Sequence, residues 1–345
     1  MDSSPPEIIL GIAENLDTKS LVNFMKTSKK AHQLIAGHQH SISKSIASHL
    51  ITHPLPNVFS SEAFMRRPLE VGRMETAVEL EKRDAHTESV LRSSFFKQGL
   101  SSRFTSLDAK QNETLHYLVK NAMKQCNHIA DIAANAPYTP SGEMWYAKLK
   151  GAYFDHRDLP VGFRMKDPYS NLGARQAQRE YIESLAEEDL AMINFLLTTL
   201  SAGFLIENFD LAQADATFPE RLVVFKECIL RHGSWFAWSY ILGDAVCHRM
   251  ADKMQRVGLT ELLSFEFGDE QAPASLLSTL SDRLKHFYLP EGSAWSHTNA
   301  DVLGRAVYDL VAGGKKEDAG EAADKVAKEV LDEVLETTLE GVMED

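Results

Sequence analysis

Apolar residues recur at helical spacing along nearly all of this 345-residue chain, and no segment shows the sustained apolar–polar alternation of a half-buried strand. The clearest stripe, which Asn112 can cap at its start, comprises Leu115, Leu118, Val119, Ala122, Met123, Cys126, Ile129 and Ala133. Thr217, with Pro219 in the first turn, starts another helix; His232-Gly233 ends it, and the next helix is expected from about Trp235 to Arg256. The pattern predicts an all-α fold, and no fixed-period repeat divides it.

The run from Leu190 to Ile206 contains no charged residue, which raises the question of a membrane-spanning helix. Its seventeen residues lie near the lower limit for crossing a bilayer, and polar side chains such as Asn194 and Thr198 interrupt it. Ser184 and Glu187 stand ahead of it at the spacing of a capping box. We therefore predict a buried core helix and expect no membrane association.

Two seams divide the chain into parts. Residues 51–74 hold three prolines with little periodicity, which predicts a connector between a small module at residues 1–50 and a helical body at residues 75–312. We expect few direct contacts between module and body. Gly313-Gly314 then breaks the helical pattern ahead of a tail at residues 313–345.

The tail has an amphipathic pattern. Acidic residues outnumber basic ones eleven to four from Lys315 onward. One face carries the apolar residues, which are Val326, Val330, Leu331, Val334, Leu335, Leu339 and Val342. The pattern predicts an acidic C-terminal helix that either docks on its own body or binds a groove on a partner. The sequence leaves both alternatives open.

Composition narrows the classes of partner. The hydrophobic share of 44% and the charged share of 25% are those of a folded protein. A net charge of −13 disfavours nucleic acid and anionic membrane surfaces, which both attract basic proteins. The three cysteines are far apart in the sequence, and the first residues lack the basic start of a secretory signal. We expect a reducing compartment, the cytoplasm or the nucleus or both.

The candidate catalytic motifs in the sequence lack residues that their chemistry requires. His156-Arg157-Asp158-Leu159 has the letters of a kinase catalytic loop. However, Phe163 stands where that loop needs an asparagine for magnesium, and no glycine-rich phosphate loop precedes it. No histidines and cysteines stand at zinc-ligand spacing, and no G-x-S-x-G elbow is present. We therefore expect no catalytic residues, no metal and no cofactor.

The first fifty residues predict three short helices. The first runs from Glu7 to Leu16 after two prolines, Asp17 caps the second, and Thr27 or Ser28 starts the third. On a helical wheel Ile8, Ile9, Ile12 and Leu16 share one face of the first helix, and Leu10 points away from it. So small a module carries more apolar side chains than its own core needs, among them Leu10, Val22 and one or both prolines. It is therefore expected to dock on another chain.

The order of residues in this module resembles the F-box, particularly that of fungal F-box proteins. The pattern is Pro-Pro-Glu-Ile-Ile-Leu-x-Ile-x-x-x-Leu-Asp-x-x-x-Leu-x-x-Phe-x-x-Thr-Ser-Lys-Lys, and the resemblance covers about residues 4–48. It implies a non-catalytic substrate receptor of an SCF-type ubiquitin ligase. The module would bind a Skp-family linker and, through it, a cullin scaffold, while the helical body would bind an unknown protein substrate.

The resemblance also implies which residues contact the linker: Pro5, Pro6, Glu7, Ile8, Ile9, Leu10, Ile12, Leu16, Leu21 and Phe24. Two other hypotheses remain open. In the second hypothesis the chain is a helical scaffold unrelated to ubiquitin, and in the third it is an enzyme of unrecognised type built on the helical body. Binding of a Skp-family linker through residues 1–50 separates the first hypothesis from the second, and a deep pocket with clustered titratable residues would support the third.

Overall fold

The computed structural model describes residues 5–53, 55–61, 67–101, 108–136, 172–266 and 275–288. Apart from one small two-stranded sheet, the regular secondary structure of these residues is helical, which confirms the predicted all-α class. The predicted tail helix at residues 313–345 and the kinase-like tetrapeptide at residues 156–159 lie outside the described residues.

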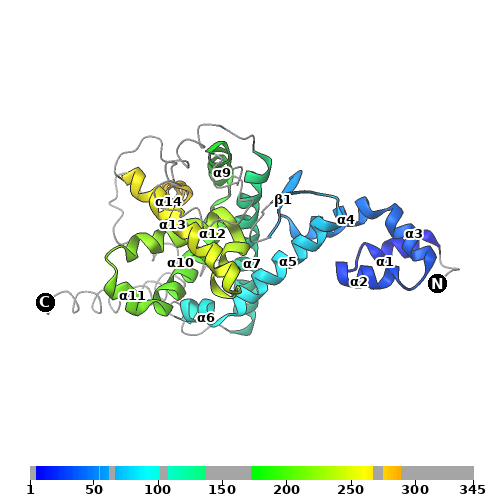
Figure 1. The fold of residues 1–345 in the computed structure, drawn as a ribbon, viewed down its shortest axis with the longest axis horizontal. Helices are drawn as coiled ribbons and strands as arrows, with labels where there is room; N and C mark the ends of the chain where they lie inside the picture. The colour runs from blue at the N-terminus through cyan, green and yellow to red at the C-terminus, as the bar shows by residue number, and fades with distance from the viewer. Residues whose placement is uncertain are drawn as a thin grey trace, which may run out of the picture.

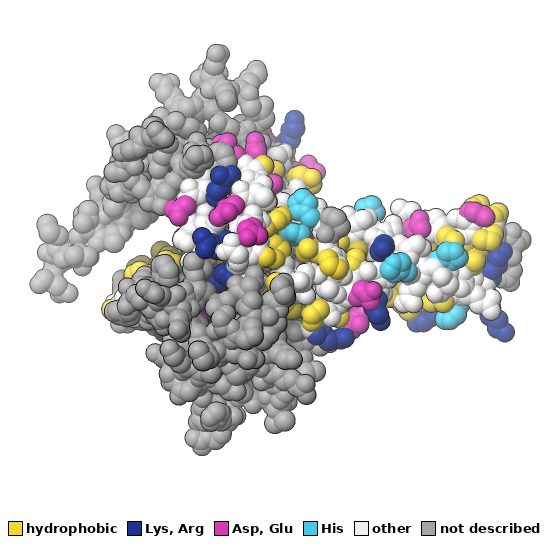
Figure 2. Space-filling model, turned by 90° about the horizontal axis from the view of Figure 1, so that it is seen from above, with side chains coloured by type: hydrophobic (Ala, Val, Ile, Leu, Met, Phe, Trp, Pro, Cys, Tyr) yellow, Lys and Arg dark blue, Asp and Glu magenta, His cyan; other side chains and the backbone are white. Residues whose placement is uncertain are grey.

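A small helical module projects from one side of a larger helical body (Figures 1 and 2). The module consists of α1 (Pro6–Ala13), α2 (Thr18–Met25), α3 (Lys29–Gly37) and α4 (Gln39–Leu50). The connection to the body is made by β1 (Asn57–Phe59), β2 (Pro68–Glu70) and α5 (Met74–Arg92). The body contains α6 (Ser94–Ser101), α7 (Ala109–Asn135), α9 (Leu172–Ser184), α10 (Glu187–Glu207), α11 (Phe209–Ala214), α12 (Phe218–Ile241), α13 (Ala245–Glu266) and α14 (Leu276–Tyr288).

Helix α10 lies in the core of the body. It packs against α6, α7, α12 and α14, and its fully buried side chains include Leu190, Ile193, Leu196, Leu197 and Leu200. Among the described helices it alone is long and apolar enough to cross a membrane by length and composition, and 67% of its apolar window is buried inside the protein. It occupies the place predicted for the uncharged run at residues 190–206.

Helix α12 is interrupted at Gly233, whose φ of 65° lies in the left-handed region that favours glycine. A Cβ at this position would stand 2.2 Å from Oδ1 of Asn127 on α7. The same oxygen accepts hydrogen bonds from the backbone N–H of Ser234 at 2.7 Å and from its hydroxyl at 2.9 Å. The predicted stop at Gly233 is thus confirmed. The helix expected at residues 235–256 is divided between the end of α12 and α13.

Helix α5 joins the module to the body. Its first turns complete the core of the module, where Ala77 is buried in the same cluster as Leu21 and Ile42, and its later turns pack against α7 and α12. The backbone N–H of Thr18 on α2 donates a hydrogen bond to Glu81 on α5 at 2.7 Å, and the Thr18 hydroxyl donates to the same carboxylate. The expectation of few direct contacts between module and body is therefore wrong at α5.

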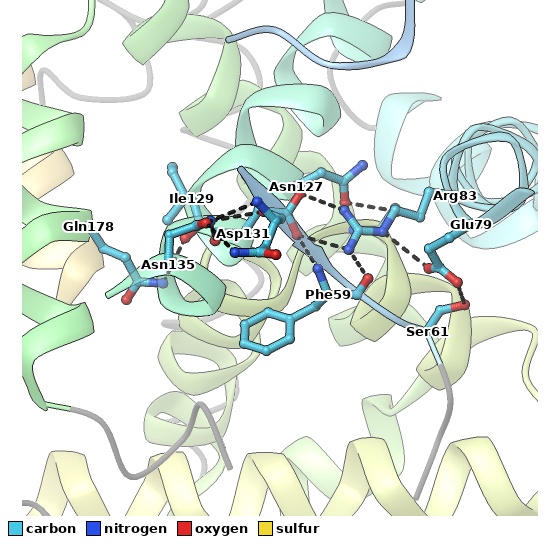
Figure 3. A network of polar contacts seen from close by, with 11 residues as sticks. Phe59, Ser61, Glu79, Arg83, Asn127, Ile129, Asp131, Asn135 and Gln178 are labelled. Carbon is cyan, nitrogen blue, oxygen red and sulfur yellow. Dashed lines mark hydrogen bonds and ion pairs between the residues drawn. The ribbon is translucent and has the colours of Figure 1, made fainter. Parts of the chain in front are cut away.

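The connector predicted at residues 51–74 contains an antiparallel pair of strands, in which Val58 lies opposite Leu69. Side chains of α7 satisfy the outer edge of β1 (Figure 3). The Asn135 side-chain oxygen accepts from the Asn57 backbone N–H at 3.0 Å, and its nitrogen donates to the Asn57 carbonyl at 2.9 Å. Asp131 accepts from the Phe59 N–H at 2.9 Å. Two side chains one helical turn apart thus replace a third strand.

Arg83 of α5 contacts both the strand β1 and the side chains of α7 that border it (Figure 3). Its guanidinium donates to both oxygens of Asp131, at 2.7 and 2.9 Å, to Glu79 at 3.3 Å, and to the carbonyl of Phe59. Glu79 in turn accepts from the Ser61 hydroxyl at 3.1 Å. Burial disfavours the charged guanidinium, but the adjacent carboxylate of Asp131, together with Glu79, leaves the pKa of Arg83 above its usual value. The strand, α5 and α7 are thereby joined through one buried cation.

Candidate partner-binding surface

The first helix presents two isoleucines to solvent. Pro5 precedes the helix and Pro6 is its first residue, where a missing backbone N–H costs no intrahelical hydrogen bond. Ile9 and Ala13 are buried, whereas Ile8 is 55% exposed and Ile12 is 43% exposed. Ile8 and Ile12 are one turn apart and therefore lie on the same side of α1. This side is an apolar stripe that the module does not cover.

The remaining predicted linker contacts differ in how far their side chains are exposed. Pro5, Pro6 and Glu7 are exposed, Ile9 and Leu21 are buried, and Leu10, Leu16 and Phe24 are partly buried against the core of the module. The helical-wheel prediction was wrong for Leu10, which packs inward, and for Ile8 and Ile12, which do not share the buried side with Ile9. The structure thus separates the ten residues into those that build the module and those that are accessible to a partner.

Hydrogen-bonded caps fix the helices behind this stripe. A carboxylate oxygen of Asp17 accepts from the backbone N–H of Ser20 at 2.6 Å, and this bond is the main reason that the pKa of Asp17 lies below its usual value. Ser28 likewise accepts from the N–H of Ala31 at 3.1 Å. The single predicted third helix is divided at His38 into α3 and α4. Local signals therefore define the starts of α2 and α3 as predicted.

Val22, which the sequence indicates is surplus to the core of the module but which is not among the ten residues carried over from the F-box pattern, is 45% exposed on α2. It follows Leu21, which is fully buried, so the two neighbours point to different sides of the helix. Val22 adds a third exposed apolar side chain to the module.

The module differs in charge from the rest of the chain. Residues 5–50 contain five lysines and only three acidic residues, within a protein whose net charge is −13. Four histidines, which are His32, His38, His40 and His49, also belong to this segment and are exposed. Figure 2 shows lysine and histidine side chains along the projecting module. A partner that binds the module thus meets an apolar stripe on a mildly basic background.

The body contains a crevice with charged walls, about 30 Å³ in volume, between α9, α12, α13 and α14. Glu227 in its wall accepts hydrogen bonds from the backbone N–H groups of Leu276 and Leu277, at 3.0 and 2.8 Å, and so caps the start of α14. Arg231 forms a two-pronged ion pair with Glu261, at 2.6 and 3.2 Å. These charged groups hold helices together. No set of three or more potential metal ligands lies together in the part of the chain that the structure describes.

Comparison with known families assigns the module. The family model of the F-box domain matches residues 5–40, a segment that includes α1, α2 and α3. No curated protein matches the chain significantly, and neither does any solved structure. The family match confirms the F-box resemblance inferred from the sequence, for the N-terminal segment of the chain.

Proposed function

We propose that this protein is a substrate-receptor subunit of an SCF-type ubiquitin ligase. The F-box segment binds a Skp-family linker, and the linker connects the protein to a cullin scaffold. The helical body beyond α5 binds a protein substrate. The protein acts as a non-catalytic adaptor, as F-box proteins generally do, and works in the cytoplasm or the nucleus.

The observation that carries this proposal is the exposed stripe of Ile8 and Ile12 beside the exposed Pro5 and Pro6, within the segment that the family model matches. The core of the module closes without these side chains, because Ile9, Ala13 and Leu21 fill it. Exposed isoleucines one turn apart leave apolar area in water, which favours association with another apolar surface. The stripe therefore supports a partner-facing role for α1.

The size of the effect can be judged from the exposed fractions. Full burial of an isoleucine side chain is favourable by about 1.5–3 kcal/mol. With 55% and 43% of Ile8 and Ile12 still exposed, a partner that covers both gains about half of this for each, or roughly 1.5–3 kcal/mol in total. This corresponds to about 10- to 150-fold in affinity.

Binding to a purified Skp-family linker tests the proposal. We expect the paired substitution Ile8→Asp with Ile12→Asp to weaken binding by at least 30-fold, because it removes the apolar contact and places carboxylates where they must be desolvated. The helical circular dichroism should be unchanged, since both side chains are exposed. Pro6→Ala should have a milder effect, because it introduces no charge.

A matched control is available on the body. Tyr117 on α7 is 64% exposed and Leu242 at the end of α12 is 44% exposed, so Tyr117→Asp with Leu242→Asp introduces the same two charges at exposed apolar sites outside the module. This variant should bind the linker as the unmodified protein does. The proposal fails if the unmodified protein binds no Skp-family linker, or if the paired α1 variant binds as tightly as the control.

A further inference from the structure

A second cluster of exposed apolar side chains lies at the end of α10 and the start of α11. Leu205, Ile206 and Phe209 are 40%, 45% and 57% exposed. Of the other large apolar residues exposed in the described part of the chain, three belong to the F-box module, and the remaining four are single side chains far apart in the sequence, namely Val78, Tyr117, Val223 and Leu242. Three such residues within five positions exceed the scatter expected of an ordinary surface.

The backbone beneath this patch is firmly held. Asn208, which ends α10, donates to the carbonyl of Phe204 both from its backbone N–H at 3.1 Å and from its side chain at 2.8 Å. Phe204 is buried, and its ring lies 5.5 Å from that of Phe218 and 4.6 Å from that of Phe225. Ala212 of α11 packs against the same core. The patch is therefore preorganised, which lowers the entropic cost of binding.

Negative charge surrounds the apolar side chains. Glu207 lies between Ile206 and Phe209 in the sequence, and Asp210 directly follows Phe209. Both are exposed, and neither forms an ion pair with a described residue. Asp215 is nearby in sequence but is paired with Arg221 at 2.9 Å. The carboxyl end of α10 adds the partial negative charge of a helix C-terminus. The patch therefore attracts cations and repels anions.

This charge selects among the possible occupants. The tail at residues 313–345 is strongly acidic, and so is repelled by Glu207 and Asp210. A second copy of the chain that used the same patch would bring four like charges together. An anionic membrane surface is repelled for the same reason. An apolar segment with lysine or arginine on its border complements both the shape and the charge of the patch.

We infer that the patch formed by Leu205, Ile206 and Phe209, bordered by Glu207 and Asp210, is a docking surface for an apolar and basic segment of another protein. The identification of that protein as the ubiquitination substrate rests on the proposed adaptor function. Figure 1 places α11 at the end of the body away from the module. A substrate docked there and a linker docked on α1 therefore do not compete for space.

A photo-crosslinking experiment on the full-length protein tests this inference. Phe209 is replaced by benzoylphenylalanine, and the protein is irradiated with a synthetic helical peptide that carries leucines on one face and lysines on the other. A peptide with glutamates in place of the lysines serves as the acidic counterpart. We expect crosslinking to the basic peptide at low salt, a loss of yield as the salt concentration rises, and little crosslinking to the acidic peptide.

Charge reversal supplies the second arm. Glu207→Lys with Asp210→Lys should weaken binding of the basic peptide at least fivefold at low salt. Reversal of Glu113 and Glu183, two exposed acidic residues elsewhere on the body, should change it less than twofold. The inference is overturned if Phe209 crosslinks to residues 313–345, if two copies of the chain crosslink, if the acidic peptide is captured equally well, or if the control reversal has the same effect.

The linker assay separates this inference from the proposed function. The Glu207→Lys and Asp210→Lys protein should bind a Skp-family linker as the unmodified protein does. If peptide capture succeeds while no linker binds, the docking surface is supported and the adaptor function is overturned. If the linker binds while peptide capture fails, the docking surface is overturned and the adaptor function is supported.

Discussion

The buried ion pair between Arg83 and Asp131 allows us to predict both the sign and the size of changes in the free energy of unfolding. Both side chains are almost completely buried, at 4% and 1% exposed, and Asp131 also accepts the Phe59 N–H. Arg83→Met keeps most of the aliphatic volume but removes the only cation that contacts Asp131 and Glu79 among the described residues. Two carboxylates are then left buried without a counter-charge. Breaking a buried pair in this way costs about 3–5 kcal/mol.

Asp131→Asn should be milder, because Arg83 keeps Glu79 as its partner and the new amide oxygen can still accept the Phe59 N–H. We expect a loss of about 1–3 kcal/mol. In the Arg83→Met background the same substitution should instead stabilise the protein, since it removes one of the uncompensated buried charges. Asp131→Asn is thus predicted to change sign with its background.

Thermal and urea unfolding, followed by far-ultraviolet circular dichroism, measures the four proteins of this cycle. For a domain of this size, Arg83→Met should lower the melting temperature by roughly 10 °C. The double variant should recover part of that loss. If Asp131→Asn destabilises the Arg83→Met protein as much as it destabilises the unmodified one, the two charges are not coupled and the reasoning is refuted.

Three further predictions concern helix contacts, capping and pH. A Cβ at Gly203 would stand 2.3 Å from a carbonyl oxygen of α6, so Gly203→Ala should cost about 1–3 kcal/mol in urea unfolding. A Cβ at Gly11 would have no neighbouring atom within 4 Å, so Gly11→Ala should stabilise α1 by about 1 kcal/mol. Ser28→Ala should cost about 1 kcal/mol through loss of the cap, and Ser28→Gly only a few tenths; equal losses would refute a capping role. Burial lowers the pKa of His86 and of His128 to about 4, so the unfolded chain binds more protons between pH 6.5 and 4. The contribution of these two histidines to the free energy of unfolding should level off above pH 6.5 and fall as the pH drops towards 4, and glutamine at both positions should flatten this slope.

Several parts of the structure were predictable because neighbouring residues determine them. Asp17 and Ser28 cap α2 and α3 through contacts three residues away, so their roles are readable from the chain itself. The uncharged run of α10 predicts burial because that much apolar area is not stable in water. Gly233 predicts a break because few other residues adopt its φ. Each of these inferences depends on local chemistry.

Capping signals gave wrong boundaries where two candidates compete. Asn112 was expected to start α7, but Asp108 forms a complete capping box with Gln111, and Asn112 lies inside the helix. Ser184 was expected to cap α10, but its hydroxyl donates to the carbonyl of Tyr181 within α9. Thr217 does stand at the start of α12, yet its hydroxyl bonds to Asp215 rather than to the helix. Sequence spacing shows that such a bond is possible and does not decide which one forms.

The connector could not have been predicted as a sheet, because the groups that hold β1 lie more than seventy residues away. Asn135 and Asp131 bond to Asn57 and Phe59 from α7, and without them the outer edge of a three-residue strand would be unsatisfied. Neither side chain carries a local signal of this role. The same holds for Glu81, whose hydrogen bonds to Thr18 fix the module on α5.

The first helix shows why the candidate surface was only partly predictable. Four of its eight residues are isoleucine or leucine, so apolar side chains surround most of the helix and a wheel does not indicate which side is buried. The core of the module decides which side is buried: α3 lies against α1, and Ile9, Leu10 and Ala13 belong to the shared cluster. What those contacts leave uncovered is the stripe of Ile8 and Ile12. A helix with more apolar area than its own module can bury requires a second surface, and the adaptor proposal supplies one in the linker.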